Sequence, residues 1–237
     1  MRVQQTAGPL CVRIDREPVE LPTQHTDPVE HAWSRLQASN PRYFNGGILS
    51  FASFDVNSGT IHARAEQYKH HAVRETVDLG VTLLAVTGVL VARDQDGIER
   101  FMIGKRSPTT HRYGNLWEFG PCGGIDQPAT DVQMLDQEMI LQELRRECIE
   151  EAGIDLSSSS ITPIALVHDD SVGSVDVVYR VHLASIPQQR ANWEYLECDW
   201  LSLSELQERI GADPDQFIPT AIPIARLLDA LKDEPSD

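Results

Sequence analysis

The sequence has no uninterrupted run of about 18 apolar residues, the length at which a segment becomes a candidate transmembrane helix. Its most apolar stretch, residues 80–92, is short and contains Thr82 and Thr87. The first residues, Met1 to Thr6, lack the apolar core of a secretory signal peptide. These absences predict a cytoplasmic protein that has no membrane partner.

Cysteine is also scarce. The four cysteines, Cys11, Cys122, Cys148 and Cys198, are scattered and form no Cys-x-x-Cys pair, so neither a zinc site nor a disulfide framework is expected. The glycine-rich patterns of dinucleotide-binding folds and of P-loop enzymes are absent as well, which leaves those two classes without support.

Basic residues are outnumbered. The chain has 36 Asp and Glu against 20 Lys and Arg, a formal charge of −16. Such a surface repels nucleic acid and anionic membranes, and it also repels a phosphorylated substrate. Any phosphate chemistry therefore requires bound cations or a local basic patch.

Hydrophobic periodicity and turn residues predict an alternation of strands and helices. The expected elements are a helix over 27–36, a hairpin of 48–56 and 60–68, a second hairpin of 81–92 and 99–105, a strand at 117–119, a helix over 134–152 that ends at Gly153, strands at 162–167, 175–183 and 198–201, a helix from a capping box at Ser202 to Gly211, and a helix over 221–231. This order indicates an α+β fold, with a mixed sheet and helices against its faces. Residues 78–237 are expected to form one domain, preceded by a β-rich extension or small subdomain over 1–77.

Three carboxylates stand at helical spacing in the longest predicted helix. Glu147, Glu150 and Glu151 are at i, i+3 and i+4 and should converge on one helix face. Two interpretations follow from the spacing alone. The face is either a solvated acidic surface tied by Glu143 and Arg146, or a platform for a hard divalent cation.

The wider pattern favours the second interpretation. Glu138, residues 139–145 and then Arg-Glu-Cys-Ile-Glu-Glu-Ala-Gly-Ile over 146–154 resemble the second half of the Nudix box, with Cys148 in place of the usual aliphatic residue. The lead-in over 114–124 resembles the family's strand and glycine loop, and residues 199–206 resemble its tryptophan strand and following helix. The resemblance covers residues 80–206 and implies a Nudix-type α/β/α sandwich with an N-terminal β-rich extension.

The resemblance also implies roles for the box residues. Glu147, Glu150 and Glu151 would bind Mg²⁺, with Mn²⁺ as the alternative. Arg146 would hold the glutamates in place, with Glu138 as its partner near the helix start.

Further site residues come from outside the helix. Gly123 and Gly124 would let the backbone approach the helix and the ligand closely. Glu194 is the candidate for an additional catalytic carboxylate, with Glu197 as second choice. The nearest basic residues for phosphate oxygens are Lys105 and Arg106, where the predicted strand 99–105 ends.

The predicted reaction is metal-dependent hydrolysis of a phosphoanhydride in a nucleoside diphosphate linked to another moiety. One departure affects the substrate, because residues 125–137 lengthen the loop between Gly124 and Glu138. The marker expected of ADP-ribose hydrolases is missing, since Asp170 stands where they have proline. Ser171 and Val172 occupy the place of the tyrosine found in dinucleoside polyphosphate hydrolases. A nucleotide sugar such as UDP-glucose is therefore the first hypothesis, with ADP-ribose or another nucleotide as the alternative.

Two other classes stay open. Isopentenyl diphosphate isomerases share the fold and use a catalytic cysteine, for which Cys122 is placed beside the glycine loop. A nucleotide sensor without catalysis is the third class, although all box glutamates are retained. A homodimer formed through the N-terminal hairpin is a further expectation.

Overall fold

The structure is a computed structural model that describes residues 1–231 except 7, 18–20 and 189–193. Its strands are β1 (Arg2–Gln5), β2 (Cys11–Asp15), β3 (Gly47–Asp55), β4 (Thr60–Gln67), β5 (Leu83–Arg93), β6 (Glu99–Arg106), β7 (Trp117–Phe119), β8 (Cys122–Gly124), β9 (Met134–Leu135), β10 (Ser160–Asp169), β11 (Ser174–His182) and β12 (Tyr195–Leu201). Its helices are α1 (Thr23–Ser39), α2 (Tyr68–Ala72), α3 (Gln137–Glu147), α4 (Leu203–Ala212) and α5 (Ala221–Ala230), with a π-helical turn at Cys148–Ala152 and a 3₁₀ turn at Pro214–Gln216.

The strands form one mixed sheet with β5 near its middle. β5 runs parallel to β11 and antiparallel to β6 and β8. Beyond β11 lie β10 and then β1, while β6 also pairs with β7 and β12. β5 is a nearly continuous apolar run whose residues are almost all buried, as expected for a strand that is covered on both faces.

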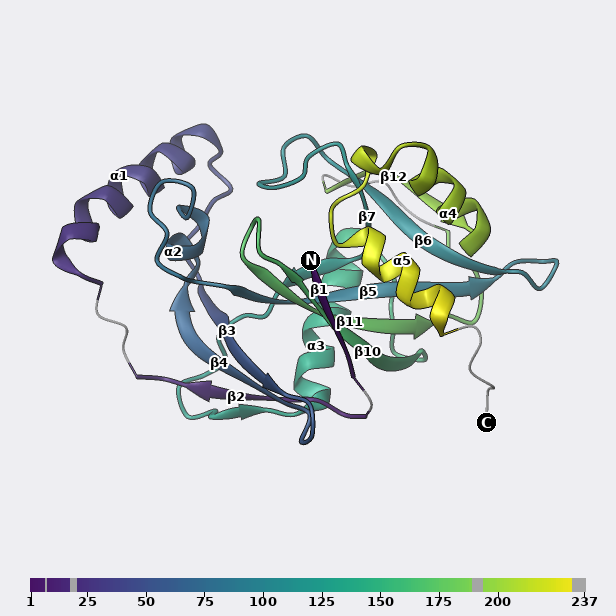
Figure 1. Cartoon of the computed structure of the whole chain (residues 1–237), viewed down its shortest axis with the longest axis horizontal. Coiled ribbons are helices and arrows are strands. Elements are labelled where there is room, and N and C mark those ends of the chain that lie inside the picture. The colour runs from purple at the N-terminus through teal and green to yellow at the C-terminus, as the bar shows by residue number, and fades with distance from the viewer. Residues whose placement is uncertain (7, 18–20, 189–193, 232–237) are drawn as a thin grey trace.

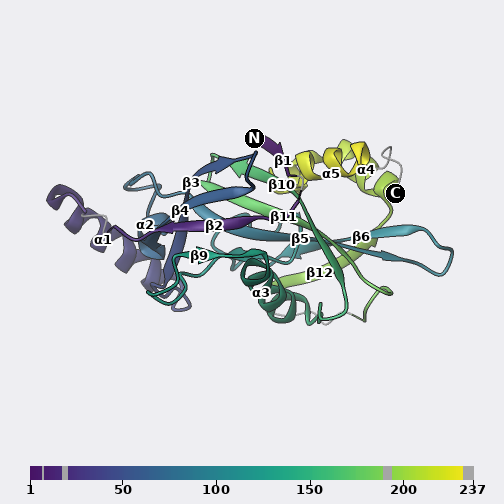
Figure 2. The same ribbon diagram turned by 90° about the horizontal axis from the view of Figure 1, so that it is seen from below.

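Helices cover the sheet on both sides. Figure 2 shows α3 against one face and α4 and α5 against the other. Alternate residues of β5 supply the two cores, because successive side chains of a strand point to opposite faces. Leu84, Val86 and Leu90 pack in the core that contains Leu144 of α3, and Val89 and Val91 pack in the core beneath α4 and α5. The α+β sandwich with a mixed sheet is therefore confirmed.

The N-terminal residues extend the same sheet. β3 meets β5 at the pair Ser50 and Leu83 and continues through β4 and β2 to β9. α1 and α2 lie at the far end of the molecule (Figure 1) and share a small core around Trp33. The predicted boundary after residue 77 falls between α2 and β5, and the division into two domains stays a prediction.

Both predicted hairpins, the strand at 117–119 and the capping box at Ser202 are confirmed. The helix predicted over 27–36 begins earlier, at Thr23, so Pro28 lies inside it. The start predicted at residue 134 is wrong because Met134 and Leu135 pair with β2, and Asp136 caps α3 by accepting from the Met139 N–H at 2.9 Å. Within the described ranges, no helix is long and apolar enough to cross a membrane.

Candidate functional site

The end of α3 changes its helical repeat where the box glutamates lie. The turn Cys148–Ala152 is π-helical and ends at Gly153, whose φ of 68° is the left-handed conformation that glycine tolerates. Glu147 and Glu151 are buried, at 8% and 4% exposure, whereas the Glu150 side chain is 59% exposed. The three glutamates therefore differ in burial, although Arg146 contacts both Glu147 and Glu150. Their convergence on one face stays a prediction.

Arg146 holds the acidic face together. Its guanidinium lies 2.7 Å from Glu147, 2.9 Å from Glu143 and 3.2 Å from Glu150. The predicted pair of Arg146 with Glu138 does not form, since Glu138 binds Arg145 instead. The ion pair between Glu143 and Arg146, which the solvated-face interpretation expected, is present on this helix.

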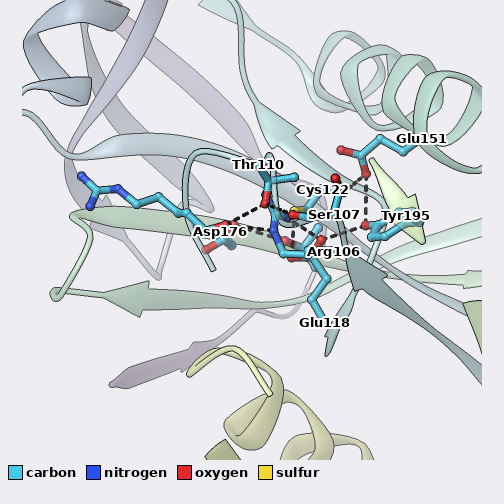
Figure 3. A network of polar contacts seen from close by, with 10 residues as sticks. Arg106, Ser107, Thr110, Glu118, Cys122, Glu151, Asp176 and Tyr195 are labelled. Carbon is cyan, nitrogen blue, oxygen red and sulfur yellow. Dashed lines mark hydrogen bonds and ion pairs between the residues drawn. The ribbon is translucent and has the colours of Figure 1, made fainter. Parts of the chain in front are cut away.

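A second group of polar side chains surrounds Glu151 and Glu118 (Figure 3). The Tyr195 hydroxyl contacts Glu118 Oε1 at 2.9 Å and Glu151 Oε2 at 3.2 Å. The Cys122 backbone N–H also donates to Glu151 Oε2, at 2.9 Å. Arg106 forms a buried ion pair with Glu118 at 2.5 Å. Glu151 is therefore held in place by β8 and β12 rather than by its own helix.

Burial raises the proton affinity of these carboxyl groups. Desolvation is the main cause that raises the pKa of Glu147 to about 7, and the charges of Glu150 and Glu194 add to it, while Arg146 opposes it. The pKa of Glu151 is raised well above its ordinary value by burial and then by Glu194 and Glu118. Burial also raises the pKa of Glu194. Each group is costly to ionise unless positive charge comes near it.

Carboxylate oxygens of this kind suit a hard divalent cation. Among the described side chains, however, no three acidic, histidine or cysteine groups are already arranged as a metal site. The contacts of Arg146 explain this, since its guanidinium lies among the carboxylates of Glu143, Glu147 and Glu150. The donor set fits a cation such as Mg²⁺, and Glu150 is exposed enough to turn toward it.

The two predicted basic residues do not act as a pair. Consecutive residues of a strand face opposite sides of the sheet, and Lys105 lies beside Glu197 and Trp117. Of these two residues, only Arg106 lines the cavity next to the glutamates. Glu197, the second choice for the extra carboxylate, pairs with Lys105 at 3.1 Å.

The glycines lie where the resemblance placed them. A Cβ on Gly123 would lie 2.2 Å from Glu147 Oε1, so glycine at this position leaves room for the Glu147 side chain in its present place against β8. A Cβ on Gly124 would press on Leu83 at 3.2 Å.

Glu194 lines the cavity that Glu147 and Arg106 also line. Its electrostatic interaction with Glu151 places it beside the buried carboxylates.

Two adjoining cavities open beside these residues. The larger, about 400 Å³, reaches from Arg146, Glu147 and Glu194 to aromatic residues of the N-terminal segment. The smaller, about 200 Å³, shares Arg106 and His111 with it. A wider hollow of about 770 Å³ lies over β2, β3 and β4, but none of the box glutamates lines it.

Several residues of the site were missed by sequence analysis. Glu118 had a readable signal, since a charged residue between buried Trp117 and Phe119 must face a different environment from its neighbours. Tyr195 gave no such signal. Asp176 lies on β11 and lines the smaller cavity, and burial raises its pKa to about 6. The sequence of this strand indicated only a structural role.

A family profile described as "NUDIX domain" matches residues 82–221. No curated protein matches the chain. Similar solved structures include the NUDIX domain of Shewanella oneidensis NrtR complexed with ADP ribose, at 18% identity and a TM-score of 0.47, which covers 64% of this chain and 89% of that chain. RenU, a Nudix hydrolase from M. smegmatis, has 17% identity and a TM-score of 0.46, with 65% and 88% covered. A C. elegans Ap4A hydrolase has 15% identity and a TM-score of 0.45, with 64% and 98% covered.

The profile spans more than half of the chain and includes the glycine loop, the box and the strand of Trp200. It confirms the resemblance drawn from the residues, and with it the prediction of a hydrolase that acts on acid anhydrides. The chain belongs to the NUDIX domain family.

Proposed function

We propose that the protein hydrolyses a phosphoanhydride bond in a nucleoside diphosphate linked to a second moiety, with Mg²⁺ as its cation and Mn²⁺ as the alternative. One observation carries this proposal. Glu147 and Glu194 line one end of the cavity, Glu151 is buried and interacts with both, and the pKa values of all three are raised. Mutual repulsion at this place costs stability unless a cation or proton compensates it.

The cation would be held by Glu147 and Glu151, joined by Glu150. It would neutralise phosphate oxygens and lower the pKa of a bound water. The chain's own residues prepare this site. Tyr195 and the Cys122 N–H orient the Glu151 carboxylate. Because this side chain is already ordered in the free protein, substrate binding does not have to supply the entropic cost of ordering it.

Other residues act around the reacting bond. Arg146 aligns Glu147 and Glu150 through its guanidinium. Glu194 is proposed to accept the proton of the attacking water, since it lines the cavity on another element and is not part of the helix. Arg106, which lines both cavities, is the proposed contact for a phosphate oxygen, although its ion pair with Glu118 offsets much of its charge.

The second moiety is proposed to be a sugar, as in UDP-glucose. The smaller cavity supports this choice because hydrogen-bonding groups such as Thr87, Ser174, Asp176 and Tyr113 line it. Hydroxyl-rich ligands require many such partners. ADP-ribose is the alternative substrate.

One observation favours a second activity. The Cys122 thiol lines the smaller cavity and donates to Glu118 at 3.5 Å, so this cavity contains both a cysteine and a glutamate, the two residue types that the isomerases of isopentenyl diphosphate use. Burial raises the pKa of this thiol well above its ordinary value, so it stays protonated at neutral pH and could donate a proton.

The test is turnover with Mg²⁺ on UDP-glucose, ADP-ribose, NADH, diadenosine tetraphosphate, 8-oxo-dGTP and isopentenyl diphosphate, with products separated by chromatography. A Glu150→Gln, Glu151→Gln double variant is the control. Cleavage of one nucleotide into two monophosphates by the wild type alone supports hydrolysis. Rearrangement of isopentenyl diphosphate supports the isomerase, and nucleotide binding without turnover of any compound supports the sensor.

A further inference from the structure

The N-terminal segment closes the cavity at the end opposite the glutamates. Tyr43 follows α1 and Tyr68 begins α2, so both lie outside the region that the family profile matches. The other wall is the connection between β6 and β7, which extends toward α2 in Figure 1. One cavity of about 400 Å³ therefore joins the box residues Arg146 and Glu147 to an aromatic end.

His111, in that connection, is the central residue of the aromatic end. Its Nδ1 lies 2.6 Å from the Tyr43 hydroxyl, and the two rings meet edge to face at 5.0 Å. Burial lowers the pKa of His111 to about 4, so the ring is neutral. The phenol is the better proton donor of the two, which places the remaining ring proton on Nε2.

The Nε2 atom of His111 is buried and finds no hydrogen-bond partner within the part of the chain that the structure describes. The same holds for Nδ1 of His71, a second neutral histidine, with a pKa lowered to about 4 by burial. Both rings line the adjoining smaller cavity together with Tyr68. Buried polar atoms are almost always hydrogen-bonded, so the Nε2 atom of His111, which lines both cavities, indicates a polar ligand where the two cavities adjoin.

The chemistry of this end selects a class of ligand. Neutral imidazoles offer single hydrogen bonds and no charge, which suits a planar heterocycle better than a phosphate. Tyr43 and Tyr68 add aromatic surface, and a base stacked on an aromatic ring gains about 1–3 kcal/mol in single-stranded complexes. Arg42 lines the same end, and a planar guanidinium also stacks on rings.

We propose that this end of the cavity binds the nucleobase of the substrate, and that His111 is a specificity-determining residue whose Nε2–H donates to the base. Tyr43 is a positioning residue that keeps the proton of His111 on Nε2. The inference rests on the proposed function, since it assumes that the substrate is a nucleotide. Under this inference, residues 40–46 and Tyr68 recognise the nucleoside part of the substrate, away from the phosphoanhydride that is cleaved.

The test is isothermal titration calorimetry of the full-length protein with UMP, AMP, GMP and CMP, and with ribose 5-phosphate, which has no base. The wild type is expected to bind at least one nucleotide about 10-fold more tightly than ribose 5-phosphate. His111→Ala should remove most of that difference and leave the affinity for ribose 5-phosphate unchanged. His182→Ala is the matched control, because His182 is exposed and lies on β11 away from the cavities.

Two further variants keep the inference falsifiable if His111→Ala folds poorly. His111→Asn retains a donor and should recover part of the nucleotide preference. Tyr43→Phe should weaken nucleotide binding about 3-fold, as loss of a neutral hydrogen bond does. In a long-range ¹H–¹⁵N spectrum, His111 should carry its proton on Nε2 in the wild type and populate both tautomers in Tyr43→Phe.

The outcomes separate this inference from the proposed function. Equal affinity for nucleotides and ribose 5-phosphate, or an unchanged preference in His111→Ala, overturns the inference even if a nucleotide is hydrolysed. An Nδ1-protonated His111 in the wild type overturns the role of Tyr43. Base-dependent binding that His111→Ala abolishes, without turnover of any nucleotide, supports the inference and overturns the hydrolase proposal.

Discussion

Replacement of Glu147 by glutamine should stabilise the metal-free protein. The carboxyl group is 11% exposed, and its pKa in the folded state is about 7 against an ordinary value of 4.5. The folded protein therefore binds more protons than the unfolded chain between these values, so stability is fully present below pH 4.5 and is lost as pH rises through 7. One pKa unit corresponds to about 1.4 kcal/mol, which gives a cost of about 3 kcal/mol at pH 8.

Glutamine has the same shape without the charge. In EDTA at pH 8, Glu147→Gln should gain up to about 3 kcal/mol, or about 6–12 °C in Tm for a chain of this size. The gain should vanish at pH 4. Since a cation that binds only the folded state stabilises it, Mg²⁺ should raise the Tm of the wild type more than that of the variant.

Thermal unfolding followed by circular dichroism would measure both effects. Glu138→Gln is the matched control, since Glu138 lies on the same helix with an exposed side chain, where substitutions change stability by about 0.5 kcal/mol or less. The reasoning is refuted if Glu147→Gln melts at or below the wild-type temperature in EDTA at pH 8 while Glu138→Gln is unchanged.

Three further predictions concern neighbours of the box. Gly123→Ala places a Cβ 2.2 Å from Glu147 Oε1, so it should cost about 1–3 kcal/mol in urea unfolding and abolish turnover. Arg106→Ala leaves Glu118 charged and buried, and should cost about 3–5 kcal/mol; a loss below 1 kcal/mol would contradict the buried pair. Lys105→Ala should leave KM within about two-fold and stability within about 1 kcal/mol, because its pair with Glu197 faces away from the cavity.

The parts of the fold that sequence analysis predicted are those with local signals. Asn57, Ser58 and Gly59 define one hairpin by turn chemistry, and Asp136 would have defined the start of α3 by capping had it been chosen over Met134. Pairing of β9 with β2 joins residues more than a hundred positions apart. Nothing in the local pattern of Met134 and Leu135 specifies that partner.

The candidate site was proposed from its composition rather than from its geometry. The identities of Glu147, Glu150 and Glu151 came from the family pattern, but their directions depend on a π-helical turn that spacing cannot reveal. The error with Lys105 and Arg106 was avoidable, because the two-residue period of a strand separates adjacent side chains.

The net charge of −16 opposes the binding of an anionic substrate. Arg106 and Arg146, which line the larger cavity beside the box glutamates, are both paired with glutamates, so neither offers a whole positive charge to a diphosphate. Under the proposed function, attraction for the substrate then comes largely from the cations. EDTA should therefore weaken the binding of a nucleoside diphosphate as well as stop turnover, by about 10-fold or more if one full charge contact is lost. Calorimetry with UDP in EDTA and in Mg²⁺ measures this, and equal affinities would mean that the arginines attract the substrate without help.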